Sequence, residues 1–139
     1  MSRAIVLSTF LVVSQLMLSQ AGSRPSSPAN DVPVISADVG PCSADFTVTS
    51  TNSKPIYKAK ITVAIKHGFG GWHRTNLEIY TNVDGKARVE GLPAKNKVPL
   101  SFDVSYEGRG TSTVVDTTEN CHGSFTAVVS DKAVADEKQ

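Results

Sequence analysis

One short segment concentrates the residue types that commonly contact ligands. It runs from residue 66 to residue 74 and contains three glycines, two histidines, a phenylalanine and the chain's single tryptophan. An aromatic ring exposed in such a loop can stack on a sugar ring or on a partner's side chain. The alternative is that the rings fold back and cap the open end of the core, and we expect this because large aromatic side chains are more often buried. The candidate ligand-contacting residues are His67, Phe69, Trp72 and His73.

Metal binding and catalysis are less well supported by the sequence. His67 and His73 could share a metal ion, but a zinc site takes at least three protein ligands and no third ligand is evident nearby. Cys121 and His122 do not form a catalytic pair, because neighbouring residues of a strand point to opposite faces. The sequence also contains no nucleophile elbow, metalloprotease helix or phosphate loop. We therefore expect no metal, no cofactor and no enzymatic activity.

The N-terminal residues are typical of an export signal. Arg3 precedes an apolar run over residues 4–13, and small residues at Ser19 and Ala21 fit cleavage after Ala21. Polar side chains interrupt the run, whereas a transmembrane helix needs about 20 predominantly apolar residues. The sequence thus predicts a signal peptide at 1–21 and a secreted or periplasmic protein, with no membrane anchor after cleavage.

The remaining chain divides into three parts. Residues 22–41 are rich in serine, proline and alanine and are expected to form a flexible lead-in, and residues 131–139 form a charged tail. Between them, residues 42–130 have the length of one small domain. Acidic and basic residues balance after removal of the signal, which indicates affinity for neither nucleic acid nor an anionic membrane.

The central domain alternates apolar and polar residues with the period of β-strands. From residue 57 to residue 65 the odd positions are apolar, starting with Tyr57, while lysines and a threonine occupy even positions. A similar alternation covers residues 98–106, and Asp84-Gly85 is a strong tight-turn signal. Seven such strands predict an all-β sandwich of two sheets. The predicted core residues are Ile61, Val63, Leu77, Val89, Leu100, Phe102, Val104, Phe125 and Ala127.

Two motifs resemble those of carboxypeptidase regulatory-like domains of the bacterial secreted type, which have a transthyretin-like (prealbumin-like) Greek-key sandwich. The resemblance covers roughly residues 42–130 and departs from the family at Ser53 or Lys54, where a turn glycine is common, and at Ala87, where a bulky aromatic residue is usual. The first motif is formed by Pro55, Ile56, Ala59, Ile61 and Val63. The second is formed by Thr81, Asp84, Gly85, Val89, Gly91, Leu92 and Pro93.

The resemblance also bears on the two cysteines. In the transthyretin-like topology that it implies, the first and last main strands are adjacent and parallel, so that Cys42 and Cys121 would lie side by side. Two cysteines in an exported chain independently favour a disulfide, and the alternative is a pair of free buried thiols. We therefore predict a Cys42–Cys121 disulfide.

The functional expectation is a secreted, non-catalytic binding or scaffold module that contacts a protein or saccharide surface. The alternative is a carbohydrate-binding module that uses the aromatic segment around Trp72. A small hydrolase of the transthyretin-like type is a third, weaker hypothesis. The C-terminal residues 136–139 do not match the Tyr-Arg-Gly-Ser signature of the hydroxyisourate hydrolases, which argues against that hypothesis.

Overall fold

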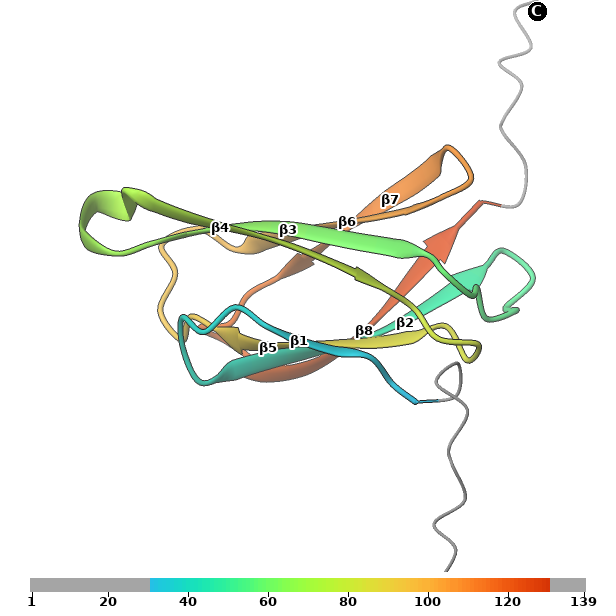
Figure 1. The fold of residues 1–139 in the computed structure, drawn as a ribbon, viewed down its shortest axis with the longest axis horizontal. Helices are drawn as coiled ribbons and strands as arrows, with labels where there is room; N and C mark the ends of the chain where they lie inside the picture. The colour runs from blue at the N-terminus through green and yellow to red at the C-terminus, as the bar shows by residue number, and fades with distance from the viewer. Residues whose placement is uncertain (1–30, 131–139) are drawn as a thin grey trace, which may run out of the picture.

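Residues 31–130, the part of the chain that the computed structural model describes, form an all-β sandwich of two four-stranded sheets (Figure 1). The strands are β1 (Val34–Ser36), β2 (Cys42–Ser50), β3 (Lys60–His67), β4 (His73–Tyr80), β5 (Lys86–Leu92), β6 (Leu100–Tyr106), β7 (Arg109–Val115) and β8 (His122–Val129). The first sheet has the order β1-β5-β2-β8 and the second the order β4-β3-β6-β7. A 3-10 turn, η1, covers Phe69–Gly71. No helix within 31–130 is long and apolar enough to cross a bilayer.

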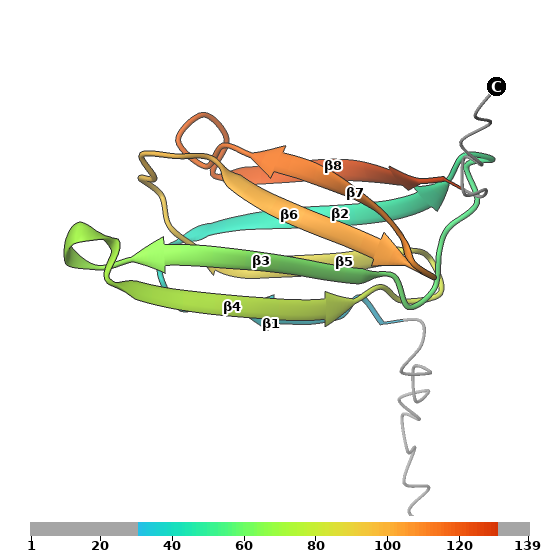
Figure 2. The same ribbon diagram turned by 90° about the horizontal axis from the view of Figure 1, so that it is seen from above.

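The chain moves repeatedly between the two sheets (Figure 2). Only the β3–β4 and β6–β7 connections join neighbouring strands of one sheet. In the first sheet, β2 pairs in parallel with β8 and antiparallel with β5. The first and last long strands of the sandwich are therefore direct neighbours.

Three phenylalanine rings meet between the sheets. The ring of Phe46 in β2 lies 4.7 Å from that of Phe102 in β6 and 5.8 Å from that of Phe125 in β8, measured between centroids. Ala87 of β5 is buried directly opposite Phe46 in the strand register. The bulk that the family resemblance led us to expect at position 87 is thus supplied by a neighbouring strand.

The predicted core is largely confirmed. Leu77 of β4 and Phe125 of β8 are only partly buried and pack against the core from the edge strands of their sheets. The other predicted core residues are all buried: Ile61, Val63, Val89, Leu100, Phe102, Val104 and Ala127.

The predicted disulfide is confirmed. It joins Cys42, the first residue of β2, to Cys121, the residue before β8, with the Cα atoms 4.6 Å apart. Because β2 and β8 are parallel, with Ser43 opposite His122, both cysteines lie at the same end of the strand pair. The bridge spans a sequence separation of 79 residues and so encloses nearly the whole sandwich.

The structure has eight strands where the sequence predicted seven. The additional strand is β1, Val34–Ser36, which pairs in parallel with β5 and lies inside the stretch expected to be a flexible lead-in. The prediction of a flexible segment is therefore wrong at 34–36. The predicted signal peptide, 1–21, the charged tail, 131–139, and the first part of the lead-in lie outside the described residues.

Two strands begin later than the alternation predicted. Tyr57 was expected on the core face of a strand, but it is 44% exposed and the strand begins only at Lys60. Residues before Lys60 cross from one sheet to the other: the N–H of Ile56 donates to Val48 of β2, and that of Lys58 donates to Thr81 after β4. Likewise β6 begins at Leu100, because the preceding residue, Pro99, has no N–H to donate to a sheet.

The predicted turn at Asp84-Gly85 is present, but it links strands of opposite sheets and is not a hairpin. Gly85 donates its N–H to the carbonyl of Asn82 (2.9 Å), and the Asn82 side chain accepts from the N–H groups of Asp84 and Lys86. Gly85 has φ +71°, and a Cβ there would collide with the carbonyl oxygen of Val48. This position therefore requires glycine for both its conformation and its close packing.

The two requirements at Gly85 can be separated by substitution. Gly85→Ala should lower the free energy of unfolding by about 3 kcal/mol or more, because it adds a backbone collision to the strain of positive φ. The matched control is Gly108→Ala, which has a similar φ of +75° but no atom within 4 Å of the added Cβ. That variant should lose only the cost of the left-handed conformation, about 1–2 kcal/mol. Equal losses in urea unfolding would contradict the collision.

Removal of the disulfide tests how far the sandwich depends on it. The double variant Cys42→Ala/Cys121→Ala should lose about 2–5 kcal/mol of stability in denaturant unfolding, the usual loss for a small secreted domain. The unsubstituted protein in reducing agent should show the same loss. Two thiols that react with an alkylating agent before any reduction, detected by mass spectrometry, would disprove the bridge.

Candidate functional site

The β3–β4 hairpin extends beyond the rest of the sandwich at one end (Figures 1 and 2). We call its terminal residues, 66–74, the hairpin tip. The extension follows from the strand register: β3 pairs with β6 only as far as Val63 opposite Phe102, but it pairs with β4 as far as His67 opposite His73. The outer half of the hairpin is therefore a two-stranded ribbon. Strand pairing supports the tip up to its turn.

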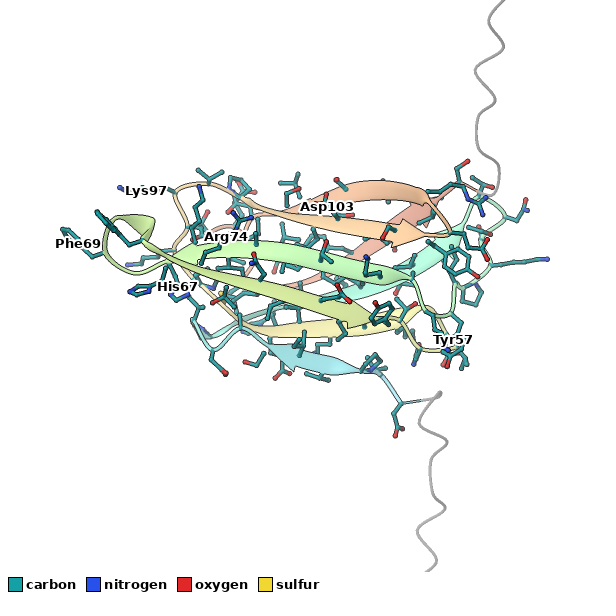
Figure 3. All side chains as sticks on the ribbon, turned by 45° about the horizontal axis from the view of Figure 1, so that its top comes forward. Tyr57, His67, Phe69, Arg74, Lys97 and Asp103 are labelled. Atoms are coloured by element: carbon teal, nitrogen blue, oxygen red, sulfur yellow. A yellow bond between two sulfur atoms is a disulfide. The ribbon has the colours of Figure 1, made fainter. Side chains whose placement is uncertain are left out.

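Phe69 and Trp72 are the most exposed large apolar side chains described in the structure, at 98% and 85%. The expectation that they cap the core is therefore wrong. The tip lies past the end of the sandwich, so its rings have no core beneath them, and Phe69 points away from the body of the protein (Figure 3). The structure instead fits the alternative of rings available to a partner.

Gly70 places the indole of Trp72. A Cβ at Gly70 would lie 2.6 Å from Nε1 and 2.8 Å from Cδ1 of that ring. Gly70 also has φ +66°, a left-handed conformation that L side chains rarely adopt. The indole of Trp72 therefore packs against the backbone of Gly70, while most of its surface stays exposed to solvent.

The two histidines form the base of the tip. Their rings stack with centroids 5.7 Å apart, and His67 Nε2 lies 2.9 Å from the hydroxyl of Thr75. Among residues 31–130, no group of three or more His, Cys, Asp or Glu side chains is arranged to hold a metal ion. The stacked histidines are the last paired residues of the hairpin, directly before the turn that contains Phe69 and Trp72.

Cations lie within the tip and in a loop at the same end of the molecule. Lys66 and Arg74 are direct cross-strand partners, and Arg74 Nε donates to the neutral side chain of Asn76 (3.1 Å). The β5–β6 loop, residues 93–99, reaches the same end of the molecule, where Lys97 lies (Figure 3), and its sequence also contains Lys95. Neither 66–74 nor 93–99 contains an aspartate or glutamate.

A second polar cluster, which the sequence analysis missed, lies on the outer face of the first sheet. Arg88 Nη1 contacts both carboxylate oxygens of Asp45 at 3.1 Å, and its Nε donates to Glu90 (2.7 Å). The Glu90 hydrogen bond and the nearby Asp45 charge raise the pKa of Arg88. Beside them, Ser43 Oγ lies 2.9 Å from His122 Nδ1, an arrangement found in nucleophilic pairs. Ser43 is only 4% exposed, although it and His122 line an open cavity of about 390 Å³ on this face.

A third feature is a cavity of about 670 Å³ at the end opposite the tip, lined by Tyr57, Lys58, Tyr80, Thr81, Asn82, Asp31 and Pro33. Tyr80 donates to Glu78 (2.7 Å), and this hydrogen bond raises the pKa of the phenol. The ammonium of Lys58 lies 5.3 Å from the centre of the Tyr57 ring. The sequence predicted neither the Arg88 cluster nor this cavity, because the alternation of apolar and polar residues shows which side chains face outward but not which strands become neighbours.

No protein-family model matches the chain, and no curated protein matches it. Among solved structures, catechol 1,2-dioxygenase from Pseudomonas arvilla is 12% identical, with a TM-score of 0.50 over 73% of this chain and 58% of that chain. A Streptomyces dioxygenase domain, from a dioxygenase carbohydrate-binding protein fusion, is 16% identical, with a TM-score of 0.48 over 73% of this chain and 90% of that chain. Of these two, only the first reaches a TM-score of 0.50, and at 12% identity it shows a similar fold and nothing about function.

The exposure of Trp72 has direct consequences for stability and fluorescence. Trp72→Ala should change the free energy of unfolding by no more than about 0.5 kcal/mol, as for other exposed sites. The emission of the unsubstituted protein, which comes from this one tryptophan, should be strongly quenched by acrylamide. Gly70→Ala should shift that emission, because the added methyl group displaces the indole. A loss of about 3–5 kcal/mol on Trp72→Ala, typical of a buried aromatic ring, would contradict this placement.

Proposed function

We propose that the chain is a secreted, non-catalytic binding module that contacts its partner through the hairpin tip. The observation that carries this proposal is the exposure of Phe69 and Trp72 at the end of a paired hairpin. Leaving a side chain the size of phenylalanine in water forgoes about 1.5–3 kcal/mol of burial free energy. Exposed apolar groups rimmed by polar residues commonly mark an interaction site.

The geometry supports binding because the tip needs little ordering when it meets a partner. β3 and β4 remain paired to His67 and His73, and the indole of Trp72 already rests against Gly70. Side chains held in place before binding lose less conformational entropy on association. Tryptophan is also among the residues most often found at the energetic centre of interfaces.

The proposal that the module is non-catalytic depends on how the Ser43–His122 contact is interpreted, because a serine beside a histidine can act as a nucleophile. Ser43 and His122 are within hydrogen-bond distance and line a cavity, but the serine is only 4% exposed and its hydroxyl also lies 3.5 Å from Arg88 Nη2. A nucleophile must reach the atom it attacks. This cluster is therefore better explained as a polar network that ties β2 to β5 and β8.

The strand order supports a transthyretin-like Greek key and the resemblance to carboxypeptidase regulatory-like domains. β2 lies between β5 and β8 with a parallel β2–β8 pair, the arrangement that the resemblance implied. Secretion is supported by the Cys42–Cys121 disulfide, since such bridges persist mainly in oxidising compartments.

A carbohydrate is a second candidate partner, and the exposed ring of Trp72 is the observation that favours it. Aromatic rings stack on the apolar faces of sugars. In this case a neutral oligosaccharide alone would be enough to change the Trp72 emission.

The proposal is tested by titrating the protein with three probes: a neutral oligosaccharide such as cellohexaose, the sulfated polysaccharide heparin, and phospholipid vesicles. At least one should shift the emission of Trp72. Phe69→Ala should weaken that binding by about tenfold or more, the usual effect of losing an aromatic contact. The matched control is Tyr57→Ala, which removes an exposed aromatic ring from the opposite end and should leave binding unchanged.

Two results would contradict the proposal. One is the absence of any emission shift with all three probes. The other is equal weakening by Phe69→Ala and Tyr57→Ala, which would place the contact away from the tip.

A further inference from the structure

We infer that the partner of the hairpin tip is an anionic lipid surface. Phe69 and Trp72 insert between the lipid headgroups, and the surrounding lysine and arginine side chains contact the phosphates and carboxylates. This inference rests on the proposed function, because it names the partner of the same tip.

The shape of the tip favours a flat partner. Small ligands such as sugars are usually held in concave sites, whereas this tip is a convex projection from the end of the sandwich (Figures 1 and 2). Phe69, at its apex, has no polar group with which to bind a sugar hydroxyl. Trp72 combines a large apolar ring with one N–H donor, the combination enriched at membrane interfaces.

The charges at the base of the tip favour an anionic partner. Lys66 and Arg74 lie directly opposite each other on neighbouring strands, and like charges in this position destabilise a sheet. Neither they nor Lys95 and Lys97 belong to an ion pair in the described part of the chain. Anionic headgroups would relieve this repulsion and leave each cation with a partner.

The nearest carboxylates on the same sheet face are too far away to neutralise the tip. Glu78 and Asp103 are both in register with Thr62, four residues along β3 from Lys66. At about 3.3 Å per residue this is about 13 Å, which exceeds the screening length of about 8 Å at physiological salt. The β1–β2 and β7–β8 loops, whose sequences contain Asp38, Asp116 and Glu119, lie at the same end of the sandwich but do not extend as far as the hairpin (Figures 1 and 2).

The balanced net charge of the chain predicted no affinity for an anionic membrane. That net charge is a sum over the whole chain and does not show that cations are concentrated near the tip while the carboxylates of this sheet face lie farther away. What matters for a surface contact is the charge within a screening length of the bilayer. Each lysine or arginine near such a surface strengthens partitioning by roughly fivefold. Two cations and two aromatic rings in the tip, with two more lysines in the β5–β6 loop at the same end, combine the apolar and electrostatic contributions that support reversible peripheral binding.

The test uses the full chain and vesicles of phosphatidylcholine containing about one-third phosphatidylserine, a strongly anionic surface. We expect the Trp72 emission to shift to shorter wavelength, and brominated lipids to quench it. Binding should weaken steeply as salt is raised, and pure phosphatidylcholine vesicles should bind far more weakly. The N-terminal apolar run is common to every variant, so differences between variants report on the tip.

Two substitutions separate the contributions of the rings and the charges. Phe69→Ala should weaken binding by about tenfold through loss of inserted apolar surface. Lys66→Gln/Arg74→Gln should weaken it by about 25-fold, the combined effect of two cations. The control Lys54→Gln/Lys86→Gln removes two exposed lysines from the opposite end and should leave binding within about twofold.

The possible failures distinguish the two proposals. If heparin or cellohexaose shifts the Trp72 emission and the anionic vesicles do not, the lipid inference is wrong while the tip remains the contact element. If vesicles bind but both tip variants match the control, the contact lies elsewhere and both proposals fail. If unfolding curves show that Phe69→Ala is destabilised, Phe69→Leu provides a conservative replacement that keeps the Trp72 emission, and brominated-lipid quenching of the unsubstituted protein gives the depth of the ring directly.

Discussion

The parallel pairing of β2 with β8 is the interaction on which the rest of the sandwich depends. It joins the first and last long strands of the domain, places Phe46 beside Phe125, and brings Cys42 next to Cys121. Such a pairing closes a very long loop, and the entropy lost in closing it must be offset by contacts formed elsewhere. The phenylalanine cluster and the disulfide both act at this strand pair, so packing and covalent chemistry stabilise the same step.

The sequence predicted the sandwich well where a strand has one buried and one solvated face. The recurrence of Ile61, Val63 and Ile65 at every second position, flanked by lysines and a threonine, predicted β3, and all three are buried. β1 was missed because it has only three residues and pairs with one neighbour at the edge of its sheet, so no alternation can develop. The start of β3 was misplaced because residues 57–59 continue the apolar–polar alternation of the strand, although they belong to the segment that connects the two sheets.

For the candidate site, the sequence predicted the composition of the hairpin tip but not its environment. His67, Phe69, Trp72 and His73 were identified from their types, yet their exposure depends on how far β3 continues after it leaves β6. That distance is set by the pairing between Val63 and Phe102, a contact between residues far apart in the chain. The Arg88–Asp45 and Ser43–His122 contacts were missed for a related reason, since each joins strands whose adjacency only the folded topology reveals.

The positions of β1 and β8 have a practical consequence for attaching the protein to a surface or a reporter. β1 begins and β8 ends at the side of the sandwich opposite the hairpin tip (Figure 1). A reporter or purification tag fused before β1 or after β8 would therefore be attached on the far side and leave the tip unobstructed. A copy immobilised through either fusion would for the same reason present the hairpin tip to the solution. Other hairpins grafted at this position would then be held in a defined orientation.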